Sequence, residues 1–95
     1  MKGRILVVDD EKDICDILQF NLENEGYIVD VAHSGEDALE MITDIHGVII
    51  LDVMMGGISG FKVAEKLRKS GNFVPIIFLT AKNTENDMLT GFSLG

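Results

Sequence analysis

The segment Ile5-Leu6-Val7-Val8-Asp9-Asp10 places two acidic residues directly after a short, continuous run of branched apolar side chains. Two further apolar runs end on oxygen-bearing residues: Val48-Ile49-Ile50-Leu51 leads into Asp52, and Pro75-Ile76-Ile77-Phe78-Leu79 leads into Thr80. Short apolar runs separated by helix-like stretches are typical of parallel strands that are buried on both faces. Because parallel strands point the same way, we expect three carboxylates and one hydroxyl to gather at one edge of a sheet.

The rest of the sequence alternates strand and helix patterns, which predicts four βα units in a doubly wound α/β fold. The expected strands cover residues 4–9, 27–32, 48–52 and 76–80. The expected helices cover residues 11–25, a segment capped by Ser34 with inward-facing residues as far as Ile45, residues 60–69, and a segment that begins near Thr84. A fifth strand is expected after the last helix, so the sequence up to Gly95 leaves the fourth strand as an apolar edge.

Composition and charge limit the classes of protein that this sequence can belong to. The chain has 95 residues, of which 46% are hydrophobic and 25% are charged, as in a single globular domain. Its net charge of −8 argues against direct binding of this segment to nucleic acid. The single cysteine, Cys15, excludes an internal disulfide and a cysteine-based zinc site, and we interpret it as a packed helix residue. With neither a signal peptide nor a membrane-length apolar run, the sequence predicts a cytoplasmic protein without membrane contact.

The clustered acids predict a metal and phosphoryl site. Carboxylates that lie together repel one another unless a cation is present, and Mg²⁺ prefers oxygen ligands. We expect Asp52 to be the nucleophile, because it follows an apolar strand and is held in place. Asp9 and Asp10 have a simpler alternative role at a helix start, and Thr80 has one as a strand residue. We interpret His33 and His46 as ordinary surface residues that lie away from the acidic edge.

Four motifs in order resemble response-regulator receiver domains of two-component signalling in bacteria. They are Leu6-Val7-Val8-Asp9-Asp10-Glu11, Leu51-Asp52-Val53-Met54-Met55, Gly60, and Leu79-Thr80-Ala81-Lys82. The resemblance implies a flavodoxin-like parallel sheet of five strands in the order 2-1-3-4-5. On this comparison, residues 1–95 form one receiver domain that is incomplete at its C-terminus, with strand five and helix five missing.

The resemblance also implies roles for individual residues. Asp52 would accept the phosphoryl group, and Asp10, Asp52 and the Met54 carbonyl would bind Mg²⁺. Asp9 would support this metal site by holding metal-bound water.

Further roles implied by the resemblance fall on the residues that surround the phosphoryl group. Thr80 would be the switch hydroxyl, and the backbone N–H of Ala81 would contact the phosphoryl group. Lys82, together with Met54, would flank the path of the hydrolytic water. The family usually has proline where Gly56 stands, which predicts a looser loop here.

The resemblance implies a regulatory phosphoacceptor rather than an enzyme. A sensor histidine kinase would supply its phosphoryl group. Self-phosphorylation with Mg²⁺ and slow self-dephosphorylation would be its only chemistry. The output would be transcriptional, through a separate winged-helix DNA-binding domain, and we expect a homodimer. Because the family's conserved Lys-Pro pair lies beyond Gly95, a phosphorylation-independent interaction module is the alternative function.

Overall fold

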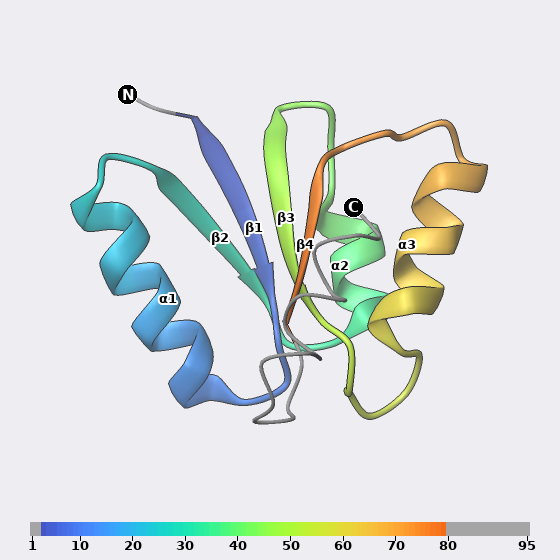
Figure 1. Cartoon of the computed structure of the whole chain (residues 1–95), viewed down its shortest axis with the longest axis horizontal. Helices are drawn as coiled ribbons and strands as arrows, with labels where there is room; N and C mark the ends of the chain where they lie inside the picture. Colours follow the sequence, from blue (N-terminus) through green and yellow to red (C-terminus); the bar gives the residue numbers. More distant parts are fainter. Residues whose placement is uncertain (1–2, 80–95) are drawn as a thin grey trace.

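The structure, a computed structural model, describes residues 3–79 as a parallel sheet with helices on both of its faces (Figure 1). The elements alternate along the chain as β1 (Arg4–Val8), α1 (Lys12–Asn24), β2 (Ile28–Ala32), α2 (Gly35–Met41), β3 (His46–Asp52), α3 (Gly60–Lys69) and β4 (Ile76–Leu79). The sheet has the order β2-β1-β3-β4, and every neighbouring pair of strands is parallel. The predicted doubly wound α/β fold is confirmed, while the predicted helix near Thr84 lies outside the described residues.

The sheet is covered by α1 on one face and by α2 and α3 on the other (Figure 1). Side chains of β1 alternate between the two cores. Leu6 and Val8 pack in the cluster that contains α2 and α3, and Ile5 and Val7 pack in the cluster that contains Cys15 of α1. These four side chains are at most 4% exposed, which confirms a strand that is buried on both faces.

The pairing of the strands brings their carboxyl ends to one edge of the sheet. Val8, the last residue of β1, pairs with Ala32 of β2 and with Leu51 of β3. The next backbone N–H, that of Asp9, donates to the Ala32 carbonyl at 3.1 Å. Asp52 ends β3 beside Leu79 of β4. The acids that follow β1 and end β3 therefore lie on neighbouring strands at the same level.

Short polar residues start the helices on the α2 and α3 face. The Ser34 hydroxyl accepts the Asp37 N–H at 3.0 Å, as the sequence predicts, and the Ser59 hydroxyl accepts the Lys62 N–H at 3.2 Å. These contacts satisfy backbone donors that lack a partner in the first helical turn. Among residues 3–79, no helix combines the length and the apolar character that crossing a membrane requires.

The connection between α2 and β3 differs from its prediction. The helix ends at Met41 rather than continuing, and Ile45 is 60% exposed instead of facing inward. His46 is the first residue of β3 and only 7% exposed, so its interpretation as a surface residue is wrong. Its Nδ1 accepts the Thr43 N–H at 3.1 Å, and its Nε2 lies 2.8 Å from Asp30 Oδ2. These hydrogen bonds allow the imidazole to be buried.

Candidate functional site

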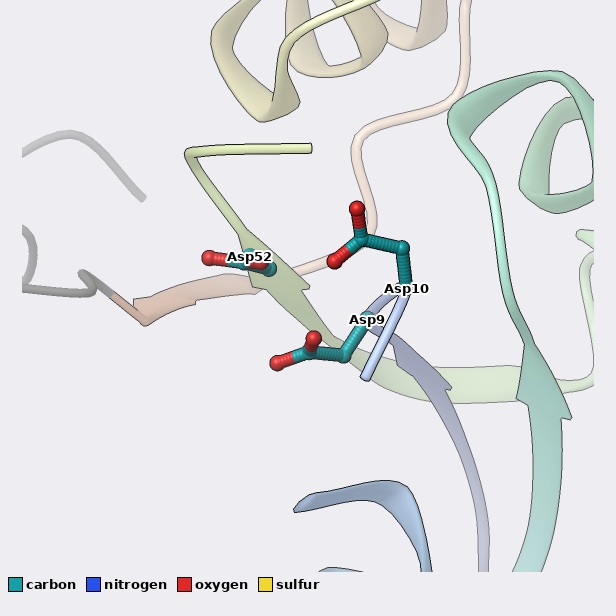
Figure 2. A group of neighbouring side chains, drawn as sticks. All are labelled: Asp9, Asp10 and Asp52. Atoms are coloured by element: carbon teal, nitrogen blue, oxygen red, sulfur yellow. The ribbon is translucent and has the colours of Figure 1, made fainter. Parts of the chain in front are cut away.

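Three carboxylates meet at the carboxyl ends of β1 and β3 (Figure 2). Asp9 and Asp10 follow β1, and Asp52 is the last residue of β3. One oxygen from each side chain lies within 4.8 Å of one oxygen from each of the others. The predicted convergence of these acids is therefore confirmed. The contribution predicted for Thr80 falls outside the described residues.

Each carboxylate accepts a backbone N–H from the loop beside it. Asp9 Oδ1 accepts the Glu11 N–H at 2.9 Å, which also supports the start of α1. Asp52 Oδ1 accepts the N–H of Met54 at 3.2 Å. Asp10 Oδ2 accepts the N–H of a residue distant in sequence, Gly56, also at 3.2 Å. The cluster thus holds both loops in place without using all of its oxygen lone pairs.

The three acids differ in burial. Asp9 and Asp52 are 2% and 6% exposed, whereas Asp10 is exposed to solvent. The pKa of Asp52 is raised to about 6, mainly by burial and then by the negative charges of Asp9 and Asp10, while the Met54 N–H opposes the shift. Such a cluster is most stable when a proton or a cation offsets the repulsion.

The chemistry of these donors fits Mg²⁺. Mg²⁺ is a hard cation that is usually bound through one or two carboxylates and keeps several waters. Asp10 lies on the solvent side of the cluster, where metal-bound water has room, and Asp52 lies on the buried side. Met54, whose carbonyl the receiver resemblance assigns to the metal, is two residues beyond Asp52 and is 59% exposed. The loop that follows β3 therefore supplies candidate ligands beside the acids.

Gly60 allows α3 to begin directly against the site. Its N–H donates to the Val53 carbonyl at 3.1 Å, and a Cβ at this position would collide with the backbone carbonyl of Asp52. The start of α3 therefore lies directly against the backbone of Asp52. By contrast, a Cβ on Gly56 would have open space around it.

Cys15 and His33 contact the site from its other side, a feature that the sequence-based reasoning missed. Cys15 Sγ and His33 Nδ1 each lie 3.3 Å from the Asp9 carbonyl oxygen. His33 is exposed, but it lies beside the acidic edge, so its predicted separation from that edge is wrong. The position of His33 in the sequence could have indicated this contact, because His33 directly follows β2, the strand next to β1.

Cys15 is confirmed as a packed helix residue. It is fully buried, and burial, followed by the negative charge of Asp9, raises the pKa of its thiol to about 11. A thiol with so high a pKa is a poor nucleophile at neutral pH.

The roles predicted for Ala81 and Lys82, like that for Thr80, concern residues outside the described range.

The fold and the acidic edge define a signalling domain of the receiver class. The sequence model of the response regulator receiver domain matches residues 5–95, and the chain belongs to this family. A relative from Bacillus subtilis (strain 168), described as the uncharacterized transcriptional regulatory protein YkoG, is 41% identical over 95 residues. That match covers 99% of this chain and 42% of YkoG, so the chain spans less than half of its relative's length.

Solved structures support the same classification. Response regulator TrrA from Thermotoga maritima, in complex with Mg(2+)-BeF, is 41% identical and superposes with a TM-score of 0.81, covering 96% of this chain and 80% of TrrA. TrrA in complex with histidine kinase ThkA is 44% identical, with a TM-score of 0.77, and the match covers 87% of this chain and 72% of that one. The flavodoxin-like receiver fold predicted from the sequence motifs is thereby confirmed.

Proposed function

We propose that this receiver domain accepts a phosphoryl group on Asp52 from a sensor histidine kinase, with Mg²⁺ bound at the acidic edge. Asp10, Asp52 and the Met54 carbonyl would bind the metal, and Asp9 would complete the metal site by holding metal-bound water. The observation that carries the proposal is the meeting of three carboxylates, within 4.8 Å, at the ends of two neighbouring strands. The presence of Mg²⁺ and BeF in the complex of the similar protein TrrA supports this assignment.

The position of Asp52 suits nucleophilic attack. It ends a buried strand, and the Met54 N–H engages Oδ1, so Oδ2 is left to attack the phosphorus atom. A bond forms between Oδ2 and phosphorus, and the bond from phosphorus to the donor's leaving group breaks, with its electron pair leaving on that group. The pKa of about 6 leaves Asp52 largely ionised at neutral pH, as the attack requires. Bound Mg²⁺ would neutralise charge on the phosphoryl oxygens.

The remaining residues have supporting roles in the proposal. Asp10 contributes a ligand from the solvent side, and Asp9 holds metal-bound water from the buried side. Thr80 and Ala81 contact the phosphoryl group, and Lys82 flanks the path of hydrolytic water. The chain is then a regulatory phosphoacceptor whose own chemistry is limited to self-phosphorylation and slow self-dephosphorylation.

We further propose that the domain acts in the cytoplasm and controls transcription through a separate DNA-binding domain. The description of YkoG as a transcriptional regulatory protein, together with its greater length, supports this output. The segment itself, with a net charge of −8, would bind neither DNA nor membrane. We also propose a homodimer that forms through β4, the last strand in the order of the described sheet. Light scattering on the protein would test this, and a monomer at micromolar concentration would refute it.

The phosphoacceptor assignment is tested by labelling with a small phosphodonor, with and without Mg²⁺. Wild type and Asp16→Asn should each gain one phosphoryl group by intact mass, only when Mg²⁺ is present, and Asp52→Asn should gain none. Asp16 is a matched control because it is an exposed acid on α1 that pairs with Lys12 at 3.2 Å. Equal labelling of wild type and Asp52→Asn would refute the assignment. If no protein is labelled, the phosphorylation-independent interaction module is favoured instead.

A further inference from the structure

The Asp9 carbonyl is held by two side chains at the point where the sheet ladder ends. The Asp9 N–H still pairs with β2, through the Ala32 carbonyl at 3.1 Å. The carbonyl of the same residue lies 3.3 Å from Cys15 Sγ and 3.3 Å from His33 Nδ1. These two side-chain atoms are 3.8 Å apart, so all three atoms form one compact group.

The chemistry of this group assigns the donor and acceptor roles. A carbonyl oxygen only accepts hydrogen bonds and has two lone pairs, so Cys15 and His33 can both donate to it. His33 must then carry a hydrogen on Nδ1, as one neutral tautomer and the protonated ring both do. A thiol is a weak donor, so the imidazole N–H supplies the stronger of the two contacts.

The direction of this carbonyl affects both acids that follow β1. The Asp9 carbonyl and the Asp10 nitrogen belong to one planar peptide group. A donor that fixes the carbonyl therefore fixes the plane from which the Asp10 side chain projects. Within residues 3–79, the other hydrogen bonds of Asp9 involve its N–H and its carboxylate, and only His33 and Cys15 contact its carbonyl.

We propose that His33 is a positioning residue for the acidic cluster, acting through its Nδ1–H on the Asp9 carbonyl. This inference rests on the proposed function, because it adds to that site a contact that aims Asp10 toward the cation. Residues that orient metal ligands from behind commonly change metal affinity when they are replaced. The contact also ties the β2–α2 connection to the acidic edge, since His33 lies between Ala32 and the Ser34 cap.

The choice of substitutions distinguishes positioning from simple packing. His33→Asn keeps a nitrogen donor at the same number of bonds from Cα as Nδ1. His33→Gln moves that donor one bond farther away, and His33→Ala removes it. His33→Asn should leave the urea midpoint of unfolding nearly unchanged, and the Ala and Gln variants should lower it by no more than the loss of one hydrogen bond, because the side chain is exposed.

Two measurements on the intact protein test the contact between His33 and the Asp9 carbonyl and its effect on Mg²⁺ binding. Residues 9 and 10 form the only Asp–Asp peptide in the sequence, so labelling aspartate with carbonyl ¹³C and ¹⁵N gives one resolved NMR signal for this peptide. Titration calorimetry measures the dissociation constant for Mg²⁺ alone. We expect Ala and Gln to weaken Mg²⁺ binding about two- to tenfold, as loss of one hydrogen bond implies, and to shift the Asp9 signal. Asn should restore both values toward wild type.

The outcomes separate this inference from the function on which it rests. Equal Mg²⁺ affinity in wild type and all three variants would overturn it, as would an Asn variant that behaves like Ala. If wild type binds no Mg²⁺, the proposed function is refuted, and the Asp9 signal alone then decides whether His33 holds the carbonyl. A signal that is the same in wild type and His33→Ala would show that it does not.

Discussion

Replacing Asp52 by asparagine should stabilise the metal-free protein at neutral pH. Asparagine has nearly the same shape and retains an oxygen that can accept the Met54 N–H, but it carries no charge. The pKa of Asp52 is about 6 in the folded chain, against 3.8 for an unperturbed aspartate, mainly because the side chain is buried. Since a pKa shift of one unit corresponds to ~1.36 kcal/mol, ionisation of this carboxylate costs the folded state about 3 kcal/mol.

The pH dependence of this gain follows from the direction of the pKa shift. Below about pH 4, Asp52 is protonated in both the folded and the unfolded chain, so the substitution should change the free energy of unfolding little. Between about pH 4 and 6, the unfolded chain releases its proton first, and wild type loses stability relative to the variant as the pH rises. Above pH 6 both states are ionised, and the variant should keep its full advantage of about 3 kcal/mol.

Urea unfolding of both proteins from pH 4 to 8, in the presence of a chelator, measures this difference. Acids that do not interact with Asp52 titrate in the same way in both proteins, so their contribution cancels in the comparison. Saturating Mg²⁺ should stabilise wild type more than Asp52→Asn, because binding to the folded state alone adds to stability. An advantage that is the same at pH 4 and pH 8, or absent at both, would refute the electrostatic reasoning.

Substitutions at three further positions test other predictions through the urea midpoint of unfolding. Gly60→Ala should lower the free energy of unfolding by about 1–3 kcal/mol and weaken Mg²⁺ binding, because the new methyl group displaces the Asp52 backbone; unchanged values for both would contradict this. Gly56→Ala should raise that free energy by about 0.4–1 kcal/mol, and Gly56→Pro should raise it by less because proline lacks the N–H donated to Asp10; a larger gain for proline would contradict this. His46→Phe should lower it by about 1–3 kcal/mol through loss of the hydrogen bonds to Thr43 and Asp30, and an unchanged midpoint would show that they contribute nothing.

The parts of the structure that the sequence predicts well depend on local patterns. The run from Ile5 to Val8 is apolar at every position, so a strand buried on both faces is the natural interpretation. The convergence of Asp9 and Asp52 then follows, because parallel strands end at the same edge of a sheet. Ser34 likewise identifies a helix start through its own side chain. None of these inferences requires knowledge of which distant residue is in contact.

The features that the sequence-based reasoning missed depend on pairing between distant residues. A histidine is buried only where partners satisfy its ring nitrogens, and those of His46 are Thr43 nearby and Asp30 on a different strand. The contact of His33 with Asp9 depends on which strand lies beside β1. The end of α2 at Met41 was also missed, since the backbone turns extended at Ile42 and β3 already begins at His46.

The pairing of β1 with β3 joins acids that are far apart in the sequence, so the acidic edge forms only when these two strands are paired. An unfolded chain still has Asp9 next to Asp10, but Asp52 is then separated from them by a long flexible segment. A partly folded chain with β3 undocked therefore carries the proposed nucleophile without its partner acids. Under the proposed function, misfolded or nascent copies of the protein are not phosphorylated. Only molecules in which β1 and β3 are paired can accept the phosphoryl group.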